Sequence, residues 1–554
     1  MMLPIAGVCS PDFRNRPGPG GSSNSHEQGA FSPMKSSRIL LTLATACLLS
    51  YSTDVLAQGR PGAAPAAPAA GGGQKAGKEA DLLPNDPVIV KKTGTFNGVS
   101  VNYTAELGWI PIREDGKVVA KMFYMYYSKN DVTDTSKRPL MLSFNGGPGT
   151  ASVWMHLGFT GPRHVTYDDD GFQQKPPAGL EDNPHSILDV ADIVYIDTIG
   201  TGFSRMVEGE DLHKFHGKLS DIQSVGDFFH TFVNKKDRWS SPKYIIGESY
   251  GTVRASGLVQ SLQQRFQMWI NGVILVSATD LNLERGPDVT HATGLPTKTA
   301  TAWYHKQLPA DLQSKPLREV LAEAEKFTMN EYLLALAKGD QLTAAERDSV
   351  ATKFARYSGL SKEYVLQANL RVDFARHWKE LLRDQRYTVG RLDTRYIGID
   401  KDAAGERPEY SPELTDWNGP FGAAINKYLR SELKYNPDIQ YNVWGNVRPW
   451  QQDEGTSVAE MLRSAMRDNP YLKVLVTGGY YDAACDYFNA IYTMNHLQPG
   501  GEFKDRYRFA WYESGHMMYL RKPDLKASND DLRTFIKWSL EDIKDYPRKA
   551  KPRQ

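Results

Sequence analysis

The pentapeptide Gly247-Glu248-Ser249-Tyr250-Gly251 has the pattern G-x-S-x-G, which can place a serine hydroxyl on a sharp turn between a strand and a helix. An apolar run at 244–246 precedes it, and an apolar helical pattern follows from about Thr252. Small residues two positions either side of the serine let such a turn close and lift the hydroxyl clear of the sheet. This context predicts Ser249 as a nucleophile; the alternative is a plain strand–helix turn.

A serine hydroxyl is a poor nucleophile until a base takes its proton, so a histidine is expected downstream with an acid between the two. His516 follows the apolar run 508–511, and Asp482 follows the apolar run 474–476. Both residues therefore come just after a predicted strand, in the chain order Ser, acid, His. Asp486 stays open as the alternative acid.

The transition state also needs N–H donors for a developing oxyanion, commonly one amide after the nucleophile and one from an early strand–loop junction. Tyr250 would supply the first. Asn145-Gly146-Gly147-Pro148-Gly149 follows the apolar run 140–144, and its consecutive glycines let backbone amides approach a substrate closely. This loop is therefore expected to supply the second donor, the alternative being a structural Gly-Pro turn.

Short apolar runs alternate with helical patterns along the chain, which predicts a mostly parallel sheet covered on both faces. Two opening strands are expected at 99–103 and 122–127, and helices are expected around 225–233 and 255–262. A last helix is expected to begin at Ser528 or Asn529. The predicted parallel strands are 140–144, 193–196, 244–246, 273–276, 474–476 and 508–511.

The alternation stops between residues 285 and 438, where helical patterns dominate. Helices are expected at 317–326, 331–337 and 374–382, and Thr343-x-x-Glu346 has the form of a capping box. We interpret the whole as an α/β-hydrolase fold with an inserted helical cap above the carboxyl ends of the strands, where ligands bind in open α/β sheets.

The first 80 residues differ from the rest in composition. Residues 1–33 are rich in Gly, Ser, Pro and Asn, and indicate a disordered extension or a misassigned upstream start. Residues 34–57 combine basic residues with a short apolar run and Ala57, which predicts a signal peptide cleaved there; a membrane anchor or a chance apolar stretch is the alternative. Residues 58–85 predict a flexible Pro/Ala/Gly linker.

From these boundaries, residues 86–284 and 439–554 are predicted to form the two parts of the hydrolase core, with the cap at 285–438. A cleaved signal would place the protein in the periplasm or outside the cell, without a permanent membrane span. Of the three cysteines, Cys9 and Cys47 precede the predicted cut, so the mature chain would keep Cys485 alone and no internal disulfide.

Composition and motifs narrow the partners. The chain has 66 basic and 65 acidic residues, a balance that argues against nucleic acid as a partner. No dinucleotide or P-loop motif is present, and His213 and His216 lack an evident third metal ligand. We therefore expect a peptide or small acyl substrate, no metal and no cofactor; the oligomeric state stays open.

The candidate residues lie in motifs that resemble the serine carboxypeptidase family, peptidase family S10. The resemblance spans about Lys117 to Pro523 and is carried, in family order, by Asn145–Gly149, Asn183-Pro184 with Asp197–Ser204, Gly247–Gly251, Asp482-x-x-Cys485 and Gly515–Met517. It implies Ser249, Asp482 and His516 as a catalytic triad, with the Gly147 and Tyr250 amides as the oxyanion hole.

The resemblance also implies that Asn145 and a protonated Glu248 bind the terminal carboxylate of the substrate, with Gly146, Cys485 and Met517 lining the site. Two carboxylates can lie together only when one holds a proton, which implies an acidic working pH. The chain departs from the family at position 159, where Phe159 stands in place of an expected second glutamate.

These observations predict a serine-type carboxypeptidase that hydrolyses peptide bonds through an acyl-enzyme. Three alternatives remain: an aminopeptidase similar to proline iminopeptidases, an esterase or acyltransferase on the same fold, and an inactive binding protein, against which the complete triad speaks. An aminopeptidase would need cap carboxylates for the substrate amine, and the candidates are Glu323, Glu325 and Glu331.

Overall fold

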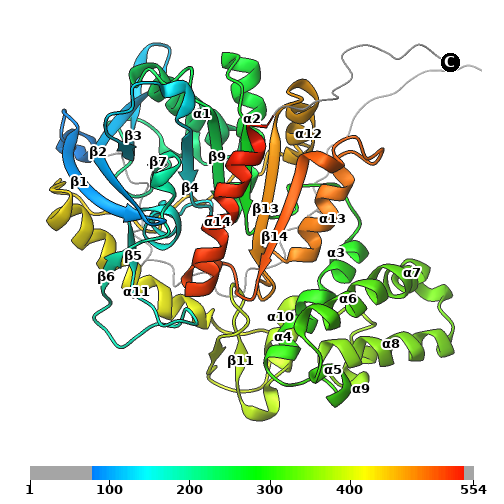
Figure 1. The fold of residues 1–554 in the computed structure, drawn as a ribbon. Coiled ribbons are helices and arrows are strands. Elements are labelled where there is room, and N and C mark those ends of the chain that lie inside the picture. Colours follow the sequence, from blue (N-terminus) through cyan, green and yellow to red (C-terminus); the bar gives the residue numbers. More distant parts are fainter. Residues whose placement is uncertain (1–77, 542–554) are drawn as a thin grey trace, which may run out of the picture. The chain divides into compact units, whose positions relative to one another are not determined.

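A computed structural model describes residues 78–541 of the chain. The predicted upstream extension, the signal peptide and the linker up to residue 77 lie outside the described residues. The centre of the molecule is a ten-stranded sheet with the order β1-β2-β3-β7-β4-β9-β10-β13-β14, and β8 (Arg205–Met206) pairs with β3 (Figure 1).

The opening strands form an antiparallel meander of β1 (Val88–Phe96), β2 (Val99–Glu114) and β3 (Lys117–Lys129). The strands expected at 99–103 and 122–127 lie within β2 and β3. The meander joins the rest of the sheet through β3, which pairs antiparallel with β7 (Asp192–Ile196). Outside this sheet, β5 (Arg163–Val165) and β6 (Leu180–Asp182) pair as a separate two-stranded ribbon.

From β7 onward every pairing along the sheet is parallel. The six predicted apolar runs all fall on strands of this part, because strands buried on both faces need apolar side chains in both directions. The α/β-hydrolase fold is thereby confirmed. The strands that follow β7 are β4 (Leu140–Phe144), β9 (Lys243–Glu248), β10 (Gly272–Val276), β13 (Lys473–Gly479) and β14 (Tyr507–Tyr512).

Helices cover both faces of the sheet, and successive strand residues point alternately to each. Leu140 and Leu142 pack with α1 (Lys218–Lys235), α2 (Tyr250–Phe266), α12 (Val458–Asp468) and α13 (Tyr487–Leu497). Met141 packs on the opposite face, with α11 (Pro412–Lys427) and α14 (Lys522–Ser539). Figure 1 shows α14 crossing one face of the parallel strands.

The last helix begins earlier than the sequence suggested. Helix α14 starts at Lys522 with Pro523 in its first turn, a position that suits proline because its missing N–H is not needed there. Ser528 and Asn529 lie buried inside the helix, and each donates a side-chain hydrogen bond back to the carbonyl of Leu525. The prediction failed because residues typical of helix caps can also bond backwards within a helix.

Between β10 and α12 the chain forms a mainly helical insertion. Several of its helices bury a hydrophobic cluster of their own, separate from the two sheet faces. The Thr343–Glu346 capping box is present, and the helix expected at 331–337 is divided between a π turn (Thr328–Tyr332) and α7. The insertion contains α3 (Pro287–Thr293), α4 (Leu295–Tyr304), α5 (Ala310–Gln313), α6 (Leu317–Phe327), α7 (Leu333–Lys338), α8 (Ala344–Ser358), α9 (Lys362–Gln367), α10 (Phe374–Glu380), α11, and a ribbon of β11 (Thr388–Val389) and β12 (Ile397–Gly398).

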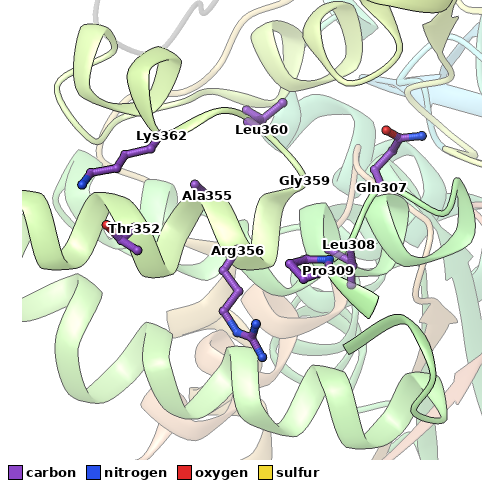
Figure 2. A pocket seen from close by; sticks show the side chains of 9 residues that line it. All are labelled: Gln307, Leu308, Pro309, Thr352, Ala355, Arg356, Gly359, Leu360 and Lys362. Atoms are coloured by element: carbon purple, nitrogen blue, oxygen red, sulfur yellow. The ribbon is translucent and has the colours of Figure 1, made fainter. Parts of the chain in front are cut away.

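A depression of about 440 Å³ lies in the insertion, lined by residues 307–309, by residues of α8 and by Gly359, Leu360 and Lys362 (Figure 2). Its two cationic side chains already have partners, because Arg356 pairs with Asp311 and Lys362 pairs with Asp348. None of the residues that line it is a predicted site residue.

The linker was expected to extend to residue 85, but the chain already packs on the sheet from residue 78. A 3₁₀ turn at Lys78–Leu82 buries Ala80, whose carbonyl accepts a hydrogen bond from Lys121 Nζ at 2.7 Å. Trp109 Nε1 donates to the carbonyl of Pro84 at 2.8 Å. Residues 78–85 therefore pack on the meander. Among residues 78–541, no helix has the length and apolar character that crossing a bilayer requires.

Candidate active site

Ser249 stands on the turn between β9 and α2, with a φ of 59° that non-glycine residues rarely adopt. A Cβ added at Gly247 would lie 2.2 Å from the carbonyl oxygen of Gly251. One added at Gly251 would lie 3.2 Å from the carbonyl oxygens of Phe144 and Asn145. A Cβ would therefore overlap the turn at Gly247 and be crowded at Gly251, and the turn holds a half-buried serine in a strained backbone at the end of a strand.

His516 and Asp482 lie in contact after neighbouring strands. The Nδ1 of His516 is 2.7 Å from Oδ2 of Asp482, and both side chains are almost completely buried. The other carboxylate oxygen of Asp482 accepts hydrogen bonds from the amides of Ala484 and Cys485, each at 2.9 Å. Because a carboxylate only accepts, Nδ1 carries the proton, which leaves Nε2 able to act as a base.

The loops after β13 and β14 are joined by backbone contacts. The amide of Tyr481 donates to the carbonyl of Ser514 at 3.0 Å. A Cβ added at Gly479 would lie 1.8 Å from that same carbonyl oxygen, so only glycine allows the two loops to approach this closely. This approach brings Asp482 to His516.

The end of β10 links the histidine loop to the nucleophile turn. The amide of Ser249 donates to the carbonyl of Val276 at 2.9 Å. The next residue, Ser277, donates its hydroxyl to the carbonyl of His516 at 2.7 Å. Strands β9, β10, β13 and β14 are consecutive and parallel, so the residues that follow them gather at one edge of the sheet.

The charge on Asp482 sets the basicity of the histidine. Burial lowers the pKa of the His516 imidazole, but the Asp482 carboxylate and the Cys485 thiol raise it by more, so the pKa lies well above its usual range. A carboxylate that favours the imidazolium in this way stabilises the form that exists after proton abstraction.

Asp486, the alternative acid, has a different role in the structure. Its carboxylate accepts a hydrogen bond from the amide of Asn489 at 2.9 Å and caps the N-terminus of α13. Burial raises the pKa of Asp486 to about 6. Of the two candidates, Asp482 is the one bonded to His516.

The glycine loop after β4 lies against the first turn of α2. A Cβ added at Gly146 would lie 2.5 Å from the amide nitrogen of Tyr250 and 2.6 Å from the carbonyl oxygen of Glu248. Gly147 has a φ of 102°, which favours glycine. Tyr250 is the first residue of α2, and amides of a first helical turn have no acceptor within the helix. The two predicted oxyanion donors thus belong to adjoining segments.

Glu248 lies beneath this turn and is only 2% exposed. Asn145 Nδ2 donates to its Oε2, and the Tyr519 hydroxyl donates to its Oε1 at 2.8 Å. Burial raises the pKa of Glu248 to about 7, although His516, Tyr519 and Asn145 oppose that rise. Glu248 therefore exchanges its proton near neutral pH.

Tyr519 is a residue of this site that the sequence analysis missed. Phe159, which stands where a second glutamate was expected, stacks on the Tyr519 ring at a centroid distance of 5.0 Å and an angle of 12°. The phenol held in this way reaches Glu248. The phenylalanine at position 159 was the available signal that Glu248 has a different partner. Sequence reasoning did not identify that partner, because Tyr519 lies 360 residues further along the chain and belongs to no motif.

The remaining predicted residues occupy different surroundings. Cys485 is a buried free thiol whose pKa is raised by burial, and Met517 is buried in the core cluster beneath the site. Potential ligand atoms of Asp482, Cys485 and His516 lie within 4.8 Å of one another, but two of these side chains already share a hydrogen bond. This cluster therefore fits proton transfer better than metal binding.

His213 and His216, the weaker candidate pair, have ring centroids 5.3 Å apart. The His216 ring also stacks on Trp450, and burial lowers its pKa to about 4. Within residues 78–541 no third ligating side chain completes a metal site with them.

Comparison with known proteins places the chain near one family. Residues 96–282 match the family model described as serine carboxypeptidase. The chain is 28% identical to Serine carboxypeptidase-like 8 of Arabidopsis thaliana over 178 residues, which are 32% of this chain and 39% of that protein. It is 32% identical to Serine carboxypeptidase S10 family member 1 of Dictyostelium discoideum over 24% of this chain and 29% of that protein. The matches thus span less than half the length of these curated relatives.

Solved structures give weaker likenesses. A prohormone-processing carboxypeptidase, Kex1(Δ)p of Saccharomyces cerevisiae, has a TM-score of 0.48 at 14% identity and covers 79% of this chain and 91% of its own. Proline iminopeptidase of Mycobacterium smegmatis has a TM-score of 0.32 at 13% identity over 80% and 98%. Neither likeness bears on the choice between activities.

Proposed function

We propose that the chain is a serine peptidase of the serine carboxypeptidase family, whose model matches residues 96–282, and that it removes C-terminal residues from peptides. The observation that carries the proposal is the buried hydrogen bond between His516 and Asp482, at the sheet edge where the Ser249 turn ends. A buried base oriented by a carboxylate is what a serine nucleophile requires.

In the proposed reaction, the Ser249 hydroxyl attacks the carbonyl carbon of the scissile bond while His516 Nε2 takes its proton. The Gly147 and Tyr250 amides would hold the developing oxyanion. His516 then gives the proton to the leaving amine, and water hydrolyses the acyl-enzyme by the same steps. Asp482 keeps the proton on Nδ1 throughout and stabilises the imidazolium.

Recognition of the substrate's terminal carboxylate is assigned to Asn145 and Glu248. Glu248 must be protonated when a carboxylate binds beside it, because two adjacent carboxylates repel. With a pKa of about 7, raised by burial, Glu248 holds this proton in mildly acidic solution and loses it above neutral pH. Tyr519 takes the place of the missing second glutamate as the partner of Glu248.

The aminopeptidase alternative finds little support in the insertion. Each of the three candidate glutamates already has a partner, since Glu323 pairs with Lys315, Glu331 pairs with Lys353, and Glu325 accepts a hydrogen bond from Tyr487. An esterase or acyltransferase would use the same Ser249 chemistry with a different leaving group.

A panel of dipeptides tests the proposal. N-blocked dipeptides with a free C-terminus should be cleaved, whereas matched C-amidated dipeptides should be poorer substrates, because they lack the carboxylate that Asn145 and Glu248 are proposed to bind. Ser249→Ala protein, purified in the same way, is the control for contaminating peptidases. Cleavage only of dipeptides with a free amino group would overturn the carboxypeptidase proposal in favour of an aminopeptidase.

Export is a separate part of the proposal, and it rests on the signal-like segment at 34–57. Expression of the chain from Met34 in a bacterial host, followed by cell fractionation and N-terminal sequencing, should find the protein in the periplasm or medium with Gln58 as its first residue. An intact N-terminus in the cytoplasmic fraction would contradict export.

A further inference from the structure

Residues 390–396 of the insertion, which we call the insertion strap, run between the loops that carry Asp482 and His516. Backbone bonds join the strap to both loops, although more than 80 residues separate them in sequence. They run from the His516 amide to the Leu392 carbonyl (2.7 Å), from the Ala483 amide to the Arg391 carbonyl (3.2 Å) and from the Thr394 amide to the Tyr481 carbonyl (2.9 Å).

The strap also touches the residue just before His516. A Cβ added at Gly515 would lie 2.4 Å from the Cβ of Asp393, so a larger residue at 515 would push the strap and the histidine loop apart. The backbone of Gly515 therefore packs directly against the Cα, Cβ and Cγ atoms of Asp393 in the strap.

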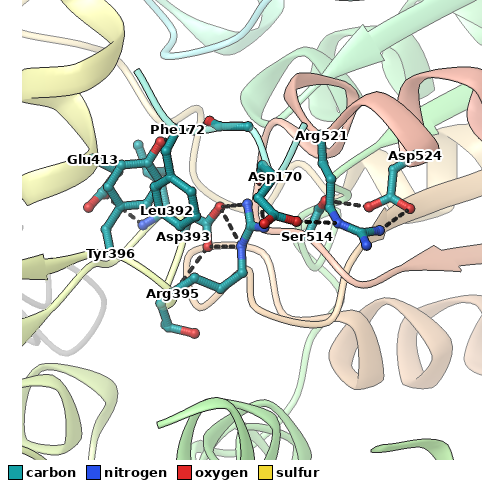
Figure 3. Close-up of polar contacts among 12 residues, drawn as sticks. Asp170, Phe172, Leu392, Asp393, Arg395, Tyr396, Glu413, Ser514, Arg521 and Asp524 are labelled. Atoms are coloured by element: carbon teal, nitrogen blue, oxygen red, sulfur yellow. Dashed lines mark hydrogen bonds and ion pairs between the residues drawn. The ribbon is translucent and has the colours of Figure 1, made fainter. Parts of the chain in front are cut away.

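A buried ion pair fixes the shape of the strap (Figure 3). Arg395 donates from Nη2 and Nε to the Asp393 carboxylate at 2.6 and 2.9 Å, and both side chains are at most 5% exposed. The Nη1 of Arg395 donates to the carbonyl of Asp170 at 3.0 Å, which ties the strap to a loop of the core. A planar guanidinium held by these three hydrogen bonds has little freedom to move.

Glu413, in the first turn of α11, holds the strap from the other side. Its Oε1 accepts a hydrogen bond from the amide of Leu392 at 2.8 Å, and the carboxyl is completely buried. Leu392 is thus held at its N–H by Glu413, while its carbonyl accepts the His516 amide. Figure 3 shows Glu413, Leu392 and the Asp393–Arg395 pair in one group.

We propose that Arg395 and Glu413 are positioning residues, which keep His516 at Asp482 by holding the insertion strap between their loops. Glu413 acts directly on the backbone of Leu392, whereas Arg395 acts through the neighbouring residue Asp393. The effect on catalysis rests on the proposed function, whereas the contact of the strap with His516 does not. The experiments below separate the two.

Hydrogen exchange of the full-length protein tests the contact itself. In Arg395→Met, the peptide that contains the His516 amide should exchange at least about tenfold faster than in wild type, because its acceptor is no longer fixed. Lys379→Met is the matched control, since Lys379 forms another buried ion pair of the insertion, with Asp400 at 2.5 Å. Equal exchange at His516 in Arg395→Met and Lys379→Met would overturn the positioning role.

Turnover tests the consequence for catalysis. Arg395→Met should lower kcat by about tenfold and leave KM within about twofold, because small displacements of a catalytic group cost rate more than ground-state binding. Lys379→Met should keep its kcat at temperatures where both variants are folded. Equal kcat in the two variants would refute the catalytic role, whereas inactivity of the wild type would refute the proposed function and leave the exchange result valid.

If Arg395→Met does not fold, two variants of Glu413 test whether the insertion strap positions His516. Glu413→Gln retains an oxygen that can accept from Leu392, so kcat should stay within about threefold of wild type. Glu413→Leu removes the acceptor and should lower kcat by about tenfold without a matching change in KM. Equal losses in the Gln and Leu variants would overturn the role of Glu413.

Discussion

The hydrolase core and the insertion contribute to the site in different ways. The core supplies side chains, and Ser249, Asp482 and His516 each sit in a short motif, as Ser249 does between Gly247 and Gly251. The insertion reaches the site through a backbone carbonyl, that of Leu392, which any residue could provide. Chemistry carried by side chains leaves a local pattern in the sequence, whereas support carried by the backbone leaves none.

The largest loss of activity is expected from a substitution in the hydrolase core. Ser249→Ala should lower turnover by a factor on the order of 10⁴ or more, because the nucleophile is lost while the packing around the turn is kept. Turnover on an N-blocked dipeptide, with a thermal melt to confirm folding, checks this. Activity close to wild type in the folded variant would remove Ser249 from the mechanism.

Two aspartates four residues apart provide the next test. Asp482→Asn should lower kcat by about 10³ to 10⁴, because an amide in place of the carboxylate no longer holds His516 in the productive tautomer. Asp486→Asn should stay within about threefold, since asparagine also caps a helix. Steady-state kinetics on both variants checks the assignment. A larger loss in Asp486→Asn would reverse the roles of the two residues.

The pH dependence of binding tests Glu248 and its unusual partner. For a substrate with a free C-terminal carboxylate, KM should rise by about tenfold per pH unit above pH 7, because the ionised Glu248 repels the substrate. Glu248→Gln should abolish this rise. Tyr519→Phe should move it to higher pH, since the Tyr519 hydroxyl favours the ionised form of Glu248.

Profiles of KM against pH for these proteins, with a C-amidated substrate as the control, give the answer. The amidated substrate should lack the rise in wild type, because it carries no negative charge at that end. A rise of the same size with both substrates would place its origin elsewhere than Glu248.

The smallest effect is expected far from the strap, in the insertion. Lys362 lines the depression in Figure 2 and pairs with Asp348 on the surface. Lys362→Ala should change the free energy of unfolding by less than about 1 kcal/mol, as exposed ion pairs contribute little, and should leave kcat/KM unchanged. Denaturant unfolding and kinetics check both values. A marked loss of kcat/KM would make the depression part of the site. The insertion would then contribute side chains to the site, as the hydrolase core does.

Much of the parallel sheet could be predicted from the sequence, because strands buried on both faces appear as uninterrupted apolar runs. The start of α14 could not, since Ser528 and Asn529 bond backwards within the helix although their types favour a cap. Site residues that lie in short motifs could also be predicted, because each motif is a local pattern of residue types and spacing. Tyr519 and the insertion strap were not, because their roles depend on contacts between distant parts of the chain.

Mapping of a fluorophosphonate adduct on the folded, full-length protein tests the central claim most directly, since the reagent reports an activated serine without assuming a substrate. We predict a single adduct on the peptide that contains Ser249, formed at least about 10³ times more slowly in His516→Ala. An unlabelled wild-type protein, or an adduct on a different serine, would contradict the account.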